Sequence, residues 1–508
     1  MFNVGSGLGR IQLPPSTPLA GYQARKEASR GVHDPLCARA LAIEYGGRCI
    51  TVLSIDILYS DALLTRMIRR AAAGSAPAGA ALDPASIMVC CSHTHSGPSR
   101  IFPESGSFDP AITDAITGAA ADATARAWAE LLPCRLYLGA GLVDGVASRR
   151  SDLAGRGATG PIRQRLAVAE FRSVAQGPSG APRAAMRLVS LACHPTVLGP
   201  DNLVVSRDWP GFAVDECEHE MRASGTERAF AVFINGAAAD VSTRYTRRAQ
   251  TFDEAARLGR LAASGAARVA AAGRLSRTSG ACLASEQITL RRRPLVGQEQ
   301  ALSAIAAAEA EAERLARCGA DEIAVKESRD RAAAWRIVLK RAQNQSGPQG
   351  TPGAGPGAAP GGVVDAEINL ARVGDLMLLF CPGEVAHETG ESLVRAVAQG
   401  QGESPTEAIA TAGSVAPTTP TAPTTPIAPI VPTVPAIGTV PAGSNAEVAA
   451  GNIWVVGYSN GHLGYLAPES AAPDAYERVM SSVASESIHE IAQAAMRLSS
   501  KGMCMDLC

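Results

Sequence analysis

The stretch Ile87-Met88-Val89-Cys90-Cys91-Ser92-His93-Thr94-His95-Ser96-Gly97-Pro98 joins a short apolar run to two histidines. The run has the length and composition of a buried strand, and the polar residues after it indicate a loop. In an extended His-x-His segment both rings project to the same side, so one metal ion can contact His93, His95 or both. The spacing alone leaves a metal site and a hydrogen-bonded surface pair equally open.

A second apolar run, residues 188–193, ends in the same way, because it is followed by His194. Three of the eight histidines of the chain therefore fall in two strand-end motifs. Loops at strand ends collect ligands and catalytic groups in α/β folds, because the sheet fixes them while the loop leaves them accessible. His93, His95 and His194 are therefore candidates for one site.

Acidic and hydroxyl groups occupy similar positions. Glu384 follows the apolar run 376–381 and is a candidate third metal ligand. Ser242 follows the run 229–234 and Asp240, and it is a candidate nucleophile or substrate contact. The alternative for an Asp-x-Ser segment is a turn or a helix cap, with no part in chemistry.

Further strands and helices alternate along the chain. Apolar runs predict strands at residues 41–45, 49–58, 87–91, 187–193, 229–234 and 453–456. Helical patterns cover residues 109–131, 208–225, 298–342 and 477–498, and the third is expected to be a hairpin broken near Gly319. This alternation predicts an α/β fold, with a mixed β-sheet core flanked by helices.

Two Pro/Gly-rich stretches interrupt the pattern. Residues 345–362 are rich in Gly, Pro and Gln, and residues 403–446 contain the Pro-Thr and Pro-Ile repeats of 415–441. Such composition favours disordered insertions. The piece between them, residues 363–384, reads as a hairpin turning at Gly374-Asp375. We therefore expect a single domain over residues 1–508, with insertions grown from its loops and a loose tail at 499–508.

Composition excludes some functions. The chain has 508 residues, 46% of them hydrophobic, and its 47 Lys and Arg almost balance its 48 Asp and Glu. No basic field exists for nucleic acid, and no apolar stretch reaches the roughly 18 residues of a membrane span. The start lacks the features of a signal peptide. We expect a soluble cytoplasmic protein with reduced cysteines, and a loose terminal peptide rather than a redox or metal pair at Cys504 and Cys508.

Taken in order, these motifs resemble the neutral/alkaline non-lysosomal ceramidase family along nearly the whole chain. His93-Thr94-His95-Ser96-Gly97-Pro98 is the most specific of them. The others are Val4-Gly5-Ser6-Gly7 with Gly21-Tyr22, Cys193-His194-Pro195-Thr196, Asp240-Val241-Ser242, Pro382-Gly383-Glu384, and Gly457-Tyr458-Ser459-Asn460 through Tyr465 to Tyr476-Glu477.

The resemblance implies a zinc-dependent amidohydrolase that releases a fatty acid and an amine from an N-acyl lipid. The implied zinc (Zn2+) ligands are His93, His194, Glu384 and Tyr465. Ser242 corresponds to the catalytic serine, and the implied amide-gripping and oxyanion-stabilising residues are His95, Arg150 and Tyr476. Either Ser242 or a water activated by zinc could be the nucleophile.

The sequence departs from the family pattern in several places. Thr243 stands where a proline usually follows the serine, and the segment around Arg150 lacks the usual Asn and Pro. The spacing from Tyr465 to Tyr476 is one residue shorter than usual. We also expect no C-terminal β-sandwich domain, so the resemblance covers the catalytic domain only. These departures affect the substrate more than the zinc site.

Three functions follow from this comparison. The first is hydrolysis of ceramide-like N-acyl lipids, with transient membrane contact. The second is a zinc hydrolase for another amide or ester, and the third is a non-catalytic binding protein on the same scaffold. All candidate ligand types are retained in the chain, which favours the first two.

Overall fold

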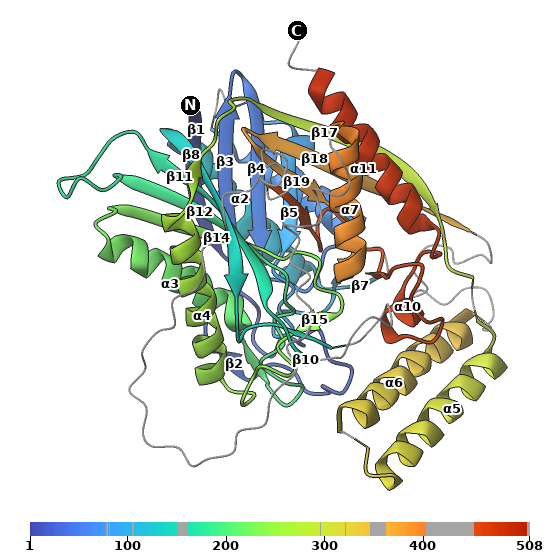
Figure 1. The fold of residues 1–508 in the computed structure, drawn as a ribbon. Coiled ribbons are helices and arrows are strands. Elements are labelled where there is room, and N and C mark those ends of the chain that lie inside the picture. Colours follow the sequence, from blue (N-terminus) through green and yellow to red (C-terminus); the bar gives the residue numbers. More distant parts are fainter. Residues whose placement is uncertain are drawn as a thin grey trace, which may run out of the picture.

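The protein is built around a nine-stranded mixed sheet (Figure 1). The computed structural model describes residues 1–77, 80, 82–103, 106–150, 160–294, 296–320, 322–345, 362–402 and 452–504. The strand order is β14 (Arg228–Ile234), β12 (Ala184–Leu191), β11 (Gln164–Ser173), β8 (Leu132–Val143), β1 (Phe2–Arg10), β3 (Cys37–Tyr45), β4 (Arg48–Ile55) and β5 (Ile87–Cys91), with β16 (Arg274–Leu275) beside β8. The pairs β12–β14 and β4–β5 are parallel and the other neighbours are antiparallel.

Alternate residues of these strands pack on opposite faces of the sheet. In β11, Leu166 and Val168 belong to a cluster with helices, whereas Ala167 and Ala169 belong to a cluster with the second sheet. The helical face carries α1 (Ala62–Gly74), α2 (Pro110–Ala129), α3 (Asp208–Ala223) and α4 (Phe252–Ala271). The first sheet is therefore covered on both faces, which suits its nearly continuous apolar strands.

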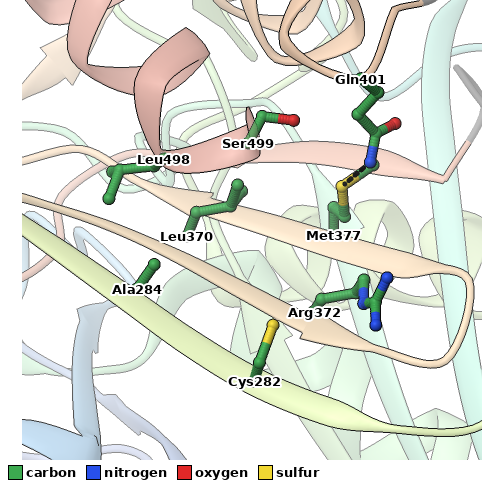
Figure 2. Close-up of a pocket in the computed structure, with 8 residues that line it drawn as sticks. All are labelled: Cys282, Ala284, Leu370, Arg372, Met377, Gln401, Leu498 and Ser499. Carbon is green, nitrogen blue, oxygen red and sulfur yellow. Dashed lines mark hydrogen bonds between the residues drawn. The ribbon is translucent and has the colours of Figure 1, made fainter. Parts of the chain in front are cut away.

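The second sheet has four strands and stacks on the first (Figure 1). Its order is β17 (Ala281–Arg291), β18 (Val363–Val373), β19 (Leu376–Phe380) and β21 (Ile453–Val456), of which β19 and β21 are parallel. Helices α7 (His387–Gly400) and α11 (Ser487–Cys504) cover its outer face. Figure 2 shows a small pocket between this sheet and the end of α11, lined by residues such as Leu370 and Leu498 and remote in sequence from the histidine motifs.

Short ladders and turns complete the fold around these layers. The paired short strands are β2 (Gly31–Val32) with β13 (Val204–Val205), β6 (Ile101–Phe102) with β7 (Ser107–Phe108), β9 (Ser148–Arg149) with both β10 (Gly160–Pro161) and β15 (Val241–Ser242), and β20 (Glu384–Val385) with β22 (Tyr465–Leu466). The short 3₁₀ helix η1 covers Pro84–Ser86. The ladders β9–β15 and β20–β22 contain four of the candidate site positions or their direct neighbours.

The glycines near the N-terminus have a packing role. Gly5, Gly7 and Gly9 alternate along β1, and a Cβ atom on each would lie 2.0, 2.1 and 2.0 Å from a backbone carbonyl oxygen of α2. Any side chain at these positions would therefore collide with the helix backbone. The absence of side chains lets α2 lie directly on β1, which explains a glycine pattern that only superficially resembles a phosphate loop.

Helices α5 (Gln298–Arg317) and α6 (Glu322–Gln345) form a hairpin beside the sheets (Figure 1). The turn includes Gly319, whose φ of 66° lies in the left-handed region that favours glycine. The hairpin packs on the short helix α10 (Tyr476–Met480) through a cluster that contains Ala301, Ile305, Ala334, Trp335 and Val479.

The sequence-based fold class is confirmed, including the hairpin at Gly374 and the break near Gly319. The helix expected at 477–498 is instead divided into α10 and α11. Between them the Val483 backbone bridges Arg292, and the Ala484 amide donates to the Arg291 carbonyl, so this segment extends the edge of β17. The pairing with the second sheet outweighs helix propensity there.

Residues 403–446, expected to be a disordered insertion, lie outside the described residues, as do 346–361 of the other insertion. Of the tail, residues 499–504 complete α11 and 505–508 are not described. Among the described residues, no helix combines the length and apolar character needed to cross a bilayer. Ten of the described cysteines, from Cys37 to Cys381, are free thiols, and eight of these are buried.

Candidate metal centre and active site

Separate segments of the chain meet at the ends of the strands. His93 follows β5, His194 follows β12, and Glu384 opens β20. His194 forms an isolated parallel bridge with Ser242, and Glu384 is the register partner of Tyr465 in the β20–β22 ladder. Backbone pairing therefore fixes the relative positions of these residues, which come from distant parts of the sequence.

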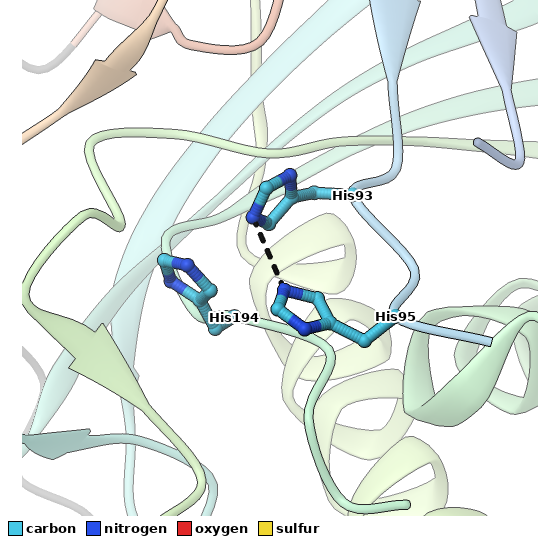
Figure 3. Close-up of side chains that lie close together, drawn as sticks. All are labelled: His93, His95 and His194. Atoms are coloured by element: carbon cyan, nitrogen blue, oxygen red, sulfur yellow. Dashed lines mark hydrogen bonds between the residues drawn. The ribbon is translucent and has the colours of Figure 1, made fainter. Parts of the chain in front are cut away.

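The imidazole rings of His93, His95 and His194 face one another (Figure 3). Each offers one ring nitrogen, and these atoms lie within 4.8 Å of one another. The Nε2 atoms of His93 and His95 are 3.4 Å apart. Oε2 of Glu384 lies 3.4 Å from Nε2 of His93 and 3.2 Å from Nε2 of His194. Three imidazoles and one carboxylate thus converge in a buried space.

Backbone carbonyls orient two of these rings. Nδ1 of His93 is 2.7 Å from the Leu58 carbonyl oxygen, and Nδ1 of His194 is 2.6 Å from that of Ala238. These contacts place the proton on Nδ1 and leave Nε2 to face the centre, as in metal-binding histidines. His93 has a φ of 70°, a strained conformation that non-glycine residues adopt mainly where function or packing requires it.

The charge states suit a cation. Burial lowers the pKa of His194 to about 4 and that of His95 well below its usual range. For Glu384, burial raises the pKa, but the neighbouring His93 and His194 outweigh burial and hold it well below its usual range. The neutral rings of His194 and His95 and the ionised Glu384 are in the forms that bind zinc.

The donor spacing also fits zinc. Ligand atoms on a tetrahedral zinc with bonds of about 2.1 Å are about 3.4 Å apart. Three of the separations given above, His93–His95, His93–Glu384 and His194–Glu384, are 3.2 to 3.4 Å and match this edge, while the three histidine nitrogens as a set lie within 4.8 Å of one another. The three histidines can therefore hold a metal ion together with Glu384.

Arg150 lies beside this centre between two tyrosines. Its guanidinium donates to the phenol oxygen of Tyr465 at 3.2 Å and to the Ala239 carbonyl, and its Nε is 3.4 Å from a Glu477 carboxylate oxygen. Its carbon Cζ lies 5.7 Å from the ring centre of Tyr465 and 5.6 Å from that of Tyr476. Burial raises the pKa of both phenols, so each keeps its proton at neutral pH.

Asp240 and Ser242 differ in their surroundings. The Asp240 carboxylate accepts a hydrogen bond from the backbone N–H of His387, the first residue of α7, at 2.7 Å. Asp240 thus has a structural role, because it caps a helix. Ser242 is buried beside His194, and its Oγ accepts a hydrogen bond from the Arg244 amide at 3.3 Å.

Two tyrosines contact the histidines, although the sequence patterns did not predict a function for either of them. The Tyr458 ring centre lies 4.0 Å from that of His93, and among the described residues its buried hydroxyl has no hydrogen-bond partner. The Tyr22 ring centre lies 4.9 Å from that of His95. Both belong to motifs that resemble the family, Gly457-Tyr458 and Gly21-Tyr22, so the sequence marked these positions but did not indicate their contact with the histidines.

The fold and this cluster define a class of α/β proteins with a largely buried histidine–carboxylate cluster at the strand ends that could hold a metal ion. Residues 2–257 match the family model described as neutral/alkaline non-lysosomal ceramidase, N-terminal. The chain belongs to that family. Comparison with curated proteins gave no match.

Solved structures agree with this fold. A neutral ceramidase from Pseudomonas aeruginosa superposes with a TM-score of 0.64 at 18% identity, covering 98% of this chain and 74% of the other. A ceramidase complexed with C2 gives a TM-score of 0.67 at 17% identity, covering 99% of this chain and 75% of the other. At this identity the likeness establishes the shared fold.

Proposed function

We propose that the chain is a zinc-dependent amidohydrolase that cleaves the N-acyl amide of ceramide-like lipids to a fatty acid and a sphingoid base. One observation carries the proposal. Three histidine nitrogens lie within 4.8 Å of one another with the Glu384 carboxylate 3.2 to 3.4 Å from two of them, and this buried cluster adjoins a charged arginine held between two tyrosines. The family membership of the chain supplies the reaction class.

His93, His194, Glu384 and Tyr465 are the proposed zinc ligands. The backbone contacts of His93 and His194 aim Nε2 at the centre, and the β20–β22 ladder sets Tyr465 beside Glu384. Zinc held by these residues would supply Lewis-acid chemistry, which polarises an amide carbonyl and lowers the pKa of water.

The neighbouring residues of the chain would handle the developing negative charge. Arg150 and Tyr476 are hydrogen-bond donors fixed at one side of the cluster, and His95 contributes a neutral ring at another. Donors held in a buried site stabilise an oxyanion more strongly than the same groups in water. We assign to Arg150, Tyr476 and His95 the binding of the amide and its oxyanion.

Ser242 is the proposed catalytic serine. It sits in the bridge with His194, so the cluster and the hydroxyl are adjacent along the backbone ladder. Its Oγ accepts only a long amide hydrogen bond from Arg244 among the described residues, and its hydroxyl proton remains available to substrate. A serine in this place can attack the amide or orient the attacking water.

The experiment is metal analysis of the purified protein, followed by fatty-acid release from a panel of substrates. The panel contains short- and long-chain ceramides in detergent, N-acyl amino acids, and matched esters. We expect one zinc per chain and turnover of a ceramide that a chelator abolishes and zinc restores. If the protein hydrolyses only a non-ceramide amide or ester, the proposed ceramide substrate is wrong and that compound class takes its place. If the zinc-loaded protein hydrolyses nothing on the panel, the proposed reaction is wrong.

A further inference from the structure

Helix α6 contacts the loops on both sides of the candidate active site. Its Asp330 forms an ion pair with Arg244, two residues after Ser242, with an N–O distance of 2.9 Å. The next residue, Arg331, faces Asp474, two residues before Tyr476, at 3.8 Å. Adjacent residues of opposite charge on α6 therefore match oppositely charged residues on the two loops.

The contact with the second loop also has an apolar part. Trp335 of α6 is 7% exposed and lies in a cluster with Ala334, Ile305 and Val479, against which Tyr476 packs. Tyr476 consequently contacts the hairpin on one side and Arg150 on the other. The hairpin therefore packs against Tyr476, one of the proposed oxyanion donors.

The two ion pairs differ in how strongly solvent screens them. The side chains of Arg244 and Asp330 are 19% and 31% exposed, whereas those of Arg331 and Asp474 are 35% and 61% exposed. Exposed pairs contribute little because water and salt screen them. Lys326 on the same helix lies 3.6 Å from Asp330 in a more exposed pair, so the better buried contact of Asp330 is the one with Arg244. Asp330 is therefore a polar link between α6 and the Ser242 loop.

We propose that Asp330 is a positioning residue of the active site. Through Arg244 it fixes the loop that carries Ser242, while the apolar face of the same hairpin fixes Tyr476, so α6 sets the distance between the two groups. This inference rests on the proposed function, in which Ser242 and Tyr476 act on the same amide. A displacement of about 1 Å can lower a rate by about 100-fold.

The test compares Asp330→Asn with Asp330→Glu, and uses Glu309→Gln as the matched control. Glu309 pairs with Arg336 within the hairpin and contacts neither loop through that pair. We expect Asp330→Asn to lower kcat by about tenfold to 100-fold with KM, zinc content and Tm unchanged. Asp330→Glu should recover most of kcat, and Glu309→Gln should match the wild type. Normal kcat in Asp330→Asn, or a lower Tm at normal kcat per folded molecule, would overturn the proposal.

A second measurement separates this inference from the proposed function. Hydrogen–deuterium exchange of the zinc-loaded protein reports the mobility of residues 243–247 and 470–480 without any turnover. Exchange in 243–247 should rise in Asp330→Asn and stay unchanged in Glu309→Gln. If the wild type hydrolyses no substrate on the panel, the proposed function fails, and this exchange pattern still decides whether α6 positions the loops.

Discussion

The sharpest consequence of the candidate metal centre concerns His194. Its ring is buried, its Nδ1 is held by the Ala238 carbonyl, and its Nε2 lies 3.2 Å from Glu384. We expect His194→Ala to abolish stoichiometric zinc, because it removes a buried ligand whose Nε2 faces the Glu384 carboxylate. Zinc per chain, measured by mass spectrometry, checks this. His489→Ala on the exposed face of α11 is the control, and a full zinc equivalent in His194→Ala would show that the ligand set is wrong.

A second prediction distinguishes His95 from Tyr465 as the fourth ligand. The ring of His95 is close enough to join the histidine set, whereas the Tyr465 hydroxyl lies against Arg150 and its residue pairs with Glu384. We expect Tyr465→Phe to weaken zinc binding, and His95→Ala to retain zinc and lose turnover. Competition with a chromophoric chelator measures both affinities. The opposite pattern would exchange the two roles.

Ser242 provides the third prediction. Ser242→Ala should keep the fold and the zinc yet lose at least about 100-fold in kcat, because a single oxyanion donor is already worth about 10²- to 10³-fold. The measurement is kcat per zinc-loaded molecule together with Tm. A turn residue would instead cost stability at unchanged turnover. Near-normal hydrolysis would remove Ser242 from the mechanism and leave water as the nucleophile.

The sequence pointed to the three histidines that the structure brings together, because their signal was local. His93, His95 and His194 each follow an apolar run, and a strand-end histidine can be read from a few neighbouring residues. The link from Asp330 to Arg244 could not be predicted in this way, because it joins residues far apart in sequence through tertiary packing. Tyr458 likewise gained a neighbour only when β5 and β21 came together.

At the scale of secondary-structure elements, the close packing of α2 on β1 predicts how a substitution at Gly7 changes the stability of the protein. A Cβ atom at Gly7 would lie 2.1 Å from the Ala123 carbonyl oxygen, and a helix backbone cannot move aside as a side chain can. We expect Gly7→Ala to lower the free energy of unfolding by about 3 kcal/mol or more, at the upper end of overpacking costs. Urea unfolding followed by circular dichroism measures it.

Gly118 on α2 is the matched control for that experiment. It is exposed, and a Cβ atom there would meet nothing within 4 Å. Gly118→Ala should therefore stabilise the helix by up to about 1 kcal/mol. Equal effects of the two substitutions would contradict the packing explanation. The sequence showed the glycine alternation in β1 but could not show what lies against it, since strand–helix contacts depend on the topology.

At the scale of the whole molecule, the long insertion is expected to be dispensable. Residues 415–441 are rich in Pro-Thr and Pro-Ile units, and the described elements on either side are complete at Gly400 of α7 and Ile453 of β21. Deleting 415–441 should leave zinc content and Tm nearly unchanged, because shortening a loop changes closure entropy only slowly. Differential scanning calorimetry measures Tm, and a large drop would show that the segment contributes to the fold.

The fold class followed from the alternation of apolar runs and helical patterns, whereas the order of strands and the stacking of two sheets did not. In-register neighbours such as β12 and β14 are separated by a helix in the sequence, and β19 and β21 by residues 381–452. Local patterns specify an element but not its partner. The division of helix 477–498 has the same origin, since the partner of residues 481–486 is the distant edge of β17.

The parallel β20–β22 ladder, with Glu384 opposite Tyr465, would give a bound metal a part in the assembly of the molecule. His93 and His194 extend from strands of the first sheet, whereas Glu384 and Tyr465 belong to segments attached to the second. An ion bound by all four would join the two sheets. The free energy of zinc binding would then add to the stability of the sheet–sheet interface, and this added stability would grow with the free zinc concentration. Loss of metal would loosen the stacking of the sheets as well as remove the catalytic centre.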